Sequence, residues 1–77
     1  MNDTTRATNF DTFYGQFCDR IVVLLGGPDK SKDFFNKHQL AHLRIVAARH
    51  AFFDGVWGYT ARGAADEWFR LILKPSI

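Results

Sequence analysis

The segment 37–50 reads KHQLAHLRIVAARH and brings together side chains that could bind a metal, transfer protons or bind anions. His38 and His42 are four residues apart, a spacing that places two zinc ligands on one face of a helix. The intervening residues are Gln-Leu-Ala, so the H-E-x-x-H signature of zinc proteases is absent. No Cys, Asp or Glu at ligand spacing completes a set. We therefore expect neither a metal site nor a cofactor here.

A helical wheel divides the polar groups of this segment into two stripes. At about 100° per residue, His38, His42 and Arg49 share one stripe, whereas Lys37 and Arg44 share another. A helix that is apolar on two sides usually packs between neighbours, so we expect this helix to be central. Apolar residues separate the stripes: Leu40, Leu43, Ala47 and Ala51 on one side, and Ala41, Ile45, Ala48 and Phe52 on the other.

The two stripes also bear on nucleic-acid binding. A DNA-recognition helix presents one contiguous basic face to the major groove, whereas here the basic residues are divided. The formal net charge of +2 gives little general attraction for nucleic acid. Asp29 and Asp33 lie among the nearby lysines and would weaken phosphate contacts. The alternative hypothesis of a nucleic-acid-binding regulator would use Lys30, Lys32, Lys37 and Arg44.

No other grouping points to catalysis. Cys18 lies beside the apolar face of its helix, and a nucleophilic Cys–His pair formed in space stays open. Gly26-Gly27-Pro28 lacks the spacing of a phosphate-binding loop. Asp66 and Glu67 are adjacent and would point apart on a helix. We therefore expect a protein that is not an enzyme and has no catalytic residues.

The cysteine content and the apolar runs bear on the compartment. One cysteine cannot form an internal disulfide, which fits a reducing compartment. The polar N-terminus shows no apolar leader, and the longest apolar run, 21–25, is far short of a membrane span. The sequence therefore predicts a cytoplasmic protein without membrane contact.

The first predicted element is a helix over about 9–25. Its apolar residues recur with helical spacing, and Thr8 or Asn9 could cap its start. Gly26, Gly27 and Pro28 end it. A buried strand over 21–25 is the competing interpretation.

The middle of the chain allows more than one division. Pro28 can begin a short helical turn near 29–35, and Asn36 with Gln39 resembles a capping box that would start a helix over about 37–53. A single helix over 31–53 stays open. At 51–60, Asp54-Gly55 favours a helix stop, and a β-hairpin is the alternative.

The last predicted helix covers about 60–74, with Thr60 as its cap and Pro75 preventing continuation. Asp66 and Arg70 have the spacing of an i, i+4 ion pair. The face expected to be buried contains Ala61, Ala64, Ala65, Trp68 and Ile72. These elements predict an all-α fold, a small bundle of three main helices with a short extra turn, in one domain over 9–77 after a flexible segment 1–8.

The functional hypothesis rests on the high content of aromatic residues. Eight Phe, two Trp and two Tyr are many large rings for 77 residues, so we expect some of them at an interface. Trp57, Tyr59 and Arg62 are of the types that dominate binding hot spots. His38, His42 and Arg49 would form a polar rim to that surface. The sequence thus predicts a non-enzymatic regulatory or adaptor protein that binds another protein, with a homodimer left open.

Overall fold

The computed structural model describes residues 9–56 and 60–76, and within these ranges it contains helices and no strand. The predicted all-α class is therefore confirmed. The main elements are α1 (Phe10–Leu24), α2 (Pro28–His38), α3 (Ala41–Asp54) and α4 (Ala61–Trp68), after which the chain continues as a π-helical turn (Phe69–Leu73) and a 3-10 turn (Lys74–Ser76).

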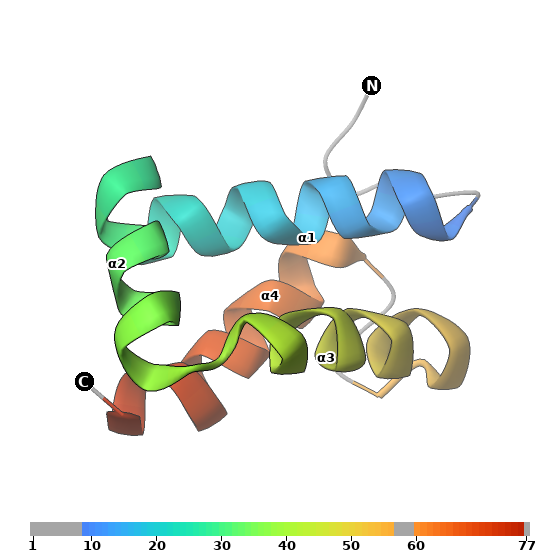
Figure 1. Ribbon diagram of the computed structural model, residues 1–77. Coiled ribbons are helices and arrows are strands. Elements are labelled where there is room, and N and C mark those ends of the chain that lie inside the picture. Colours follow the sequence, from blue (N-terminus) through green and yellow to red (C-terminus); the bar gives the residue numbers. More distant parts are fainter. Residues whose placement is uncertain (1–8, 57–59, 77) are drawn as a thin grey trace.

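The helices form a small bundle around α1. α1 and α3 run side by side in opposite directions, α2 connects them at one end, and α4 crosses behind both (Figure 1). α1 contacts each of the other three helices, and its contact with α4 is the most extensive. The central helix is therefore α1 and not, as expected, the helix that follows α2. α3 buries one side only: its buried alanines, Ala47, Ala48 and Ala51, come from both predicted apolar sides, and the predicted polar stripe with His42 and Arg49 faces outward.

α1 begins and ends as its sequence predicts. The Asn9 side chain accepts a hydrogen bond of 2.8 Å from the Thr12 amide, which caps the first turn. Gly26 and Gly27 have φ values of 98° and 120°, and the Gly27 amide donates to the Val22 carbonyl over 2.9 Å. Glycine tolerates this left-handed backbone, so the helix closes here. The strand considered for 21–25 is wrong, since most of that segment is helical.

The boundary between α2 and α3 differs from the prediction. The expected short turn near 29–35 is the larger part of an eleven-residue helix, and Gln39 ends it in the left-handed region at φ 54°. The amide of Leu40 donates to the Phe35 carbonyl over 3.1 Å, and that of Gln39 to Asn36, which is the Schellman pattern of a helix end. Gln39 is thus a C-cap rather than part of a capping box. The next helix starts at Ala41 instead of Lys37, and the alternative of one helix over 31–53 is wrong.

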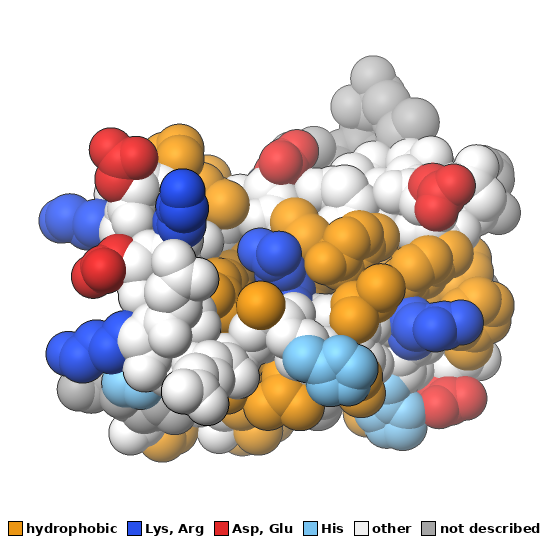
Figure 2. Space-filling model, viewed as in Figure 1, with side chains coloured by type: hydrophobic (Ala, Val, Ile, Leu, Met, Phe, Trp, Pro, Cys, Tyr) orange, Lys and Arg blue, Asp and Glu red, His pale blue; other side chains and the backbone are white. Residues whose placement is uncertain are grey.

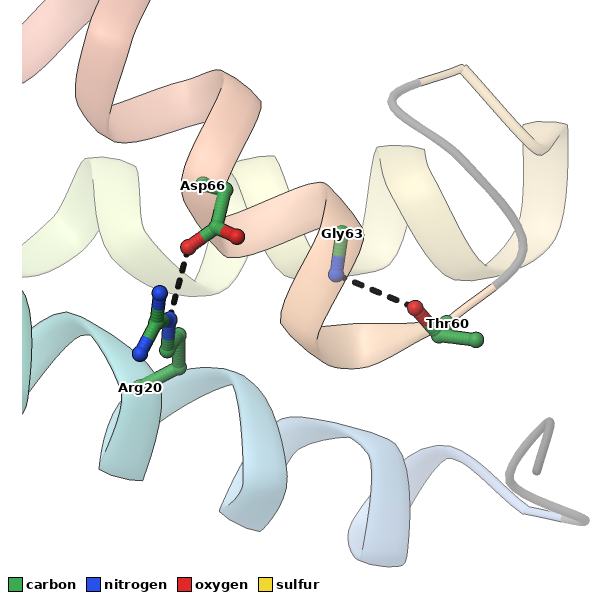
Figure 3. Close-up of polar contacts among 4 residues, drawn as sticks. All are labelled: Arg20, Thr60, Gly63 and Asp66. Atoms are coloured by element: carbon green, nitrogen blue, oxygen red, sulfur yellow. Dashed lines mark hydrogen bonds and ion pairs between the residues drawn. The ribbon is translucent and has the colours of Figure 1, made fainter. Parts of the chain in front are cut away.

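The end of α3 and the start of α4 follow the sequence. Gly55 has φ 66° and its amide donates to the Ala51 carbonyl over 3.0 Å, so the predicted helix stop is confirmed. Thr60 caps α4 through its hydroxyl, which accepts from the Gly63 amide over 3.0 Å (Figure 3).

The core combines aromatic rings with alanines. The ring of Phe17 lies 5.6 Å from that of Trp68, and the ring of Phe13 lies 5.1 Å from that of Phe52. Small residues on α3 and α4 allow the helices to approach, and the rings fill the wider gaps. The buried apolar residues are Phe13, Phe17, Ile21, Phe35, Ala47, Ala48, Ala51, Ala61, Ala64, Ala65, Trp68 and Leu73.

The π-helical turn after α4 changes which residue is buried. The Lys74 amide donates to the Phe69 carbonyl, five residues back, so this turn holds one residue more than an α-helical turn. The next core position after Trp68 is consequently five residues on, at Leu73, which is 0% exposed. Ile72, which α-helical spacing places in the core, is 41% exposed. That part of the predicted buried face is wrong.

Candidate interaction surface

The predicted stripe of His38, His42 and Arg49 does not lie on one helix. His38 is in the last turn of α2, with its ring centroid 4.6 Å from that of Phe34, whereas the other two residues are exposed on α3. The break at Gln39 therefore removes the i, i+4 relation on which a zinc pair would depend. In the part of the chain that the structure describes, no three His, Cys, Asp or Glu side chains group as a metal site would require.

The predicted aromatic connection is only partly within the structure. Trp57 and Tyr59 lie outside the described residues. Arg62 is exposed in the first turn of α4 and lines an open hollow of about 320 Å³ together with Gln16, Asp19, Arg20 and Val23.

An exposed surface on α3 combines two of the predicted partner-binding residues, His42 and Arg49, with apolar residues that the sequence did not single out. Six exposed residues fall within about 120° of the helix circumference, on the side away from the buried alanines. Half of them are large apolar side chains, and Phe53 is 64% exposed. We call this surface the α3 outer face, and it comprises His42, Leu43, Val46, Arg49, His50 and Phe53.

Aromatic rings extend this face toward α1. The ring of Phe10 stacks on that of Phe53 at 5.8 Å and on that of Tyr14 at 5.7 Å, and it meets Phe52 edge-on at 5.8 Å. Figure 2 shows hydrophobic side chains gathered over α1 and α3, with basic and histidine side chains among them. The exposed apolar surface is therefore continuous between the two helices.

The sequence offers Arg44 as a phosphate contact, but the structure places it at the inner edge of α3. Its guanidinium carbon is 4.9 Å from the centre of the Phe35 ring, a cation–π contact with α2. Its Nε is buried and has no hydrogen-bond partner within the described residues. Arg44 is therefore half-buried where α1, α2 and α3 meet, rather than aligned with the exposed lysines of α2.

Tyr14 and Cys18 face Arg44 from α1. Burial raises the pKa of Tyr14, and the hydrogen bond and charge of Arg44 act in the opposite direction. Burial also raises the pKa of Cys18, against the lowering effects of Tyr14 and Arg44. A cysteine held as the thiol is a poor nucleophile. The groups that act on Cys18 are Tyr14, Arg44 and Asp19, with no histidine among them, so the geometry gives no support to a Cys–His pair.

Elsewhere on the surface, side chains of opposite type pair within the described residues. Arg20 of α1 binds Asp66 of α4 at 2.7 Å (Figure 3). Arg70 binds Glu67 at 2.7 Å, so the predicted Asp66–Arg70 pair is wrong: each of these two side chains has a different partner. On α3, the His50 ring lies 2.6 Å from a carboxylate oxygen of Asp54.

The lysines of α2 are exposed among carboxylates. Lys30, Lys32 and Lys37 alternate along the helix with exposed Asp29 and Asp33, as the sequence indicates. Figure 2 shows the acidic and basic side chains gathered over α2, at the end of the molecule away from the exposed apolar surface. Two of these lysines border a second open hollow of about 330 Å³, which is lined by Leu24, Leu25, Lys30, Asp33, Phe34, Lys37 and His38.

Comparison of the chain with protein-family models, with curated proteins and with solved structures finds no match in any of the three. Among the described residues, every helix is too short or too polar to cross a lipid bilayer.

Proposed function

We propose that the protein is a small non-enzymatic adaptor or regulator that binds another protein through the α3 outer face. The observation that carries this proposal is the exposure of Leu43, Val46 and Phe53 on one side of a helix whose other side is packed. Large apolar side chains grouped on a surface are typical of protein-binding sites. The stacked Phe10 and Phe53 rings offer the rigid aromatic area that such sites use.

The charges of this face favour an acidic partner. Among its six residues Arg49 carries the one formal charge, two are histidines, of which His50 pairs with Asp54, and none is Asp or Glu. Interfaces match opposite potentials, so the expected partner is an apolar segment with carboxylates at its edges. The alternative is that a second copy of the chain covers this face. A symmetric dimer of that kind would bring two such faces, neither of which contains Asp or Glu, into contact with each other.

The sequence contributes the rest of the proposal. Trp57 and Tyr59 have the side chains of hot-spot residues, and exposed Arg62 follows them at the start of α4. All three, with His38, stay in the proposal as partner-binding residues on the strength of the sequence. The single cysteine supports a cytoplasmic setting.

The test is affinity capture from the host cytoplasm with three tagged baits: the unchanged chain, Val46→Glu and Lys32→Glu. Both substitutions introduce a glutamate at an exposed helical position, but only Val46 lies on the α3 outer face. We expect a partner that the unchanged chain and Lys32→Glu retain and that Val46→Glu loses. Equal capture by all three baits, each with unchanged circular dichroism, would overturn the assignment of this face.

Light scattering on the purified chain separates the two occupants. The proposal expects the monomer mass of 8.8 kDa. A doubled mass that Val46→Glu reduces to the monomer would make the occupant a second copy and would replace the acidic partner.

The alternative function is nucleic-acid binding, and three of the four residues predicted for it lie at the surface. Lys30, Lys32 and Lys37 are exposed, whereas Arg44 is half-buried against Phe35. Because acidic residues separate the lysines, the structure favours the protein partner. A steeply salt-dependent affinity for duplex DNA would reverse that preference.

A further inference from the structure

Arg44 carries a charge that the fold does not neutralise. The ion pairs within the described residues use Arg20, Arg70 and His50, but not Arg44. Its Nε is the one buried side-chain nitrogen or oxygen of the described residues that has no hydrogen-bond partner. A buried donor without an acceptor is rare in folded proteins, and here it shows that no internal acceptor lies beside the guanidinium.

The surroundings hold the guanidinium in place. The Phe35 ring of α2 lies 4.9 Å from its central carbon, and Tyr14 of α1 lies close enough for the Arg44 charge to lower the pKa of its phenol. The side chain is therefore fixed from two helices besides its own. Its terminal nitrogens, unlike Nε, are exposed or hydrogen-bonded. A planar fork of donors that packs against a ring and has no internal carboxylate partner suits an external carboxylate.

We propose that Arg44 is the residue that binds the carboxylate of an Asp or Glu side chain of the partner protein, next to an apolar partner residue. The inference rests on the proposed function and names the chemistry of the partner. The apolar partner residue packs against the aromatic surface of Phe10 and Tyr14, while the carboxylate meets the outer edge of the guanidinium.

The single charge favours a carboxylate over a phosphate. One guanidinium neutralises one carboxylate, whereas a phosphate group near neutral pH carries about two charges. The contacts of the Arg44 side chain are a Phe ring and a phenol, not a second cation. A phosphate would therefore be under-neutralised in a partly apolar setting, which is unfavourable.

The experiment uses a small probe that contains only the proposed chemistry. N-acetylphenylalanine has a carboxylate beside an aromatic ring, and N-acetylphenylalaninamide is the same molecule without the charge. Titration is followed by NMR through the Nε–H signal of Arg44 and the backbone amides around it. We expect saturable shifts with the carboxylate and none with the amide. Equal shifts with both probes would overturn the proposal.

Two variants locate the binding. Arg44→Met keeps an unbranched side chain over Phe35 but removes the fork, and Arg70→Met removes an exposed arginine that lies outside both proposed contact surfaces and pairs with Glu67. We expect the first to weaken carboxylate binding at least tenfold and the second less than twofold. Unchanged binding in Arg44→Met would show that the arginine only packs. If this variant does not fold, Arg44→Lys replaces it, and binding as tight as that of the unchanged chain would contradict the proposal.

Failure here is distinct from failure of the proposed function. An Arg44→Met bait that still captures the partner would overturn the carboxylate contact and leave the α3 outer face intact. In the same way, Val46→Glu is expected to lose the partner while the probe titration stays within twofold, because Val46 and Arg44 lie on different sides of α3.

Discussion

The Nε of Arg20 donates a hydrogen bond to Oδ1 of Asp66 over 2.7 Å, and this ion pair joins α1 to α4 across 46 positions of sequence (Figure 3). The two side chains are 26% and 43% exposed, so solvent screens part of the attraction. The pair lies on the most extensive helix contact of the fold. It therefore supports the packing of α4 without being its main cause, which is the burial of alanines and Trp68.

Removing this pair should lower stability slightly. We expect Asp66→Asn to reduce the free energy of unfolding by about 0.5–1 kcal/mol, the upper part of the range for partly exposed pairs. Urea denaturation at low salt measures it. Glu67→Gln is the matched control, because it removes a pair within one helix turn that is more exposed. A larger loss in the control would contradict the structural role given to Asp66.

Enlarging an alanine in the core should destabilise the fold more. Ala64 is fully buried on the inner face of α4, so Ala64→Leu must displace neighbouring side chains. We expect a loss of about 1–3 kcal/mol by urea denaturation. Ala41→Leu, at an exposed position in the first turn of α3, should change stability little. Equal effects of the two would contradict the close approach of α4.

The left-handed residues between helices give predictions of opposite sign. Gln39 has φ 54°, where glycine is more favourable, so Gln39→Gly should raise the free energy of unfolding by about 0.5–1 kcal/mol. Gly55 has φ 66°, and a Cβ there would meet no atom within 4 Å, so Gly55→Ala should cost about 1 kcal/mol through backbone strain alone. Thermal melting tests both predictions: the melting temperature should rise for Gln39→Gly and fall for Gly55→Ala.

Alkaline pH should destabilise the protein through α1. Burial raises the pKa of Cys18 above its ordinary value of 9.0, and burial likewise raises the pKa of Tyr14 above 10.0. The unfolded chain then loses these protons first, so stability is fully present below pH 9 and falls as pH rises through 9 and 10 toward the folded-state pKa values. Denaturation across this range measures the fall. The double variant Cys18→Ala, Tyr14→Phe should flatten it, and an unchanged slope would contradict the assignment.

Local signals predicted much of the fold. Asn9, Thr60 and Gly55 act as caps because short-range hydrogen bonds and backbone freedom determine helix ends. The start of α3 could not be predicted in this way. Asn36 and Gln39 match a capping box, but packing of Phe35 in the core continues α2 through them, and Gln39 accepts a left-handed conformation. Tertiary packing overrode the local preference there.

The candidate surface was less predictable than the fold. The sequence shows two apolar sides and two polar stripes on α3, but not that the stripe with His42 and Arg49 is the exposed one, since that depends on where α1 and α4 pass. Similarly, the position of Arg44 over Phe35 depends on the bend at Gln39. A helical wheel over 37–50 treats that segment as one continuous helix and therefore could not predict this contact. The excess of aromatic residues was the available signal, and exposed Phe53 accounts for part of it.

The π-helical turn at the end of α4 is equivalent to one residue added to a regular helix. It rotates everything after it by about 100° relative to the preceding turns, and so it exchanges Ile72 for Leu73 as the residue that closes the core. In a related chain that lacks one residue of this turn, the segment would be an ordinary amphipathic α-helix, and the same side chains would face the core. In such a chain, Leu71 and Ile72 would no longer both lie at the surface, so this single added residue determines how much apolar area the end of the molecule presents to its surroundings.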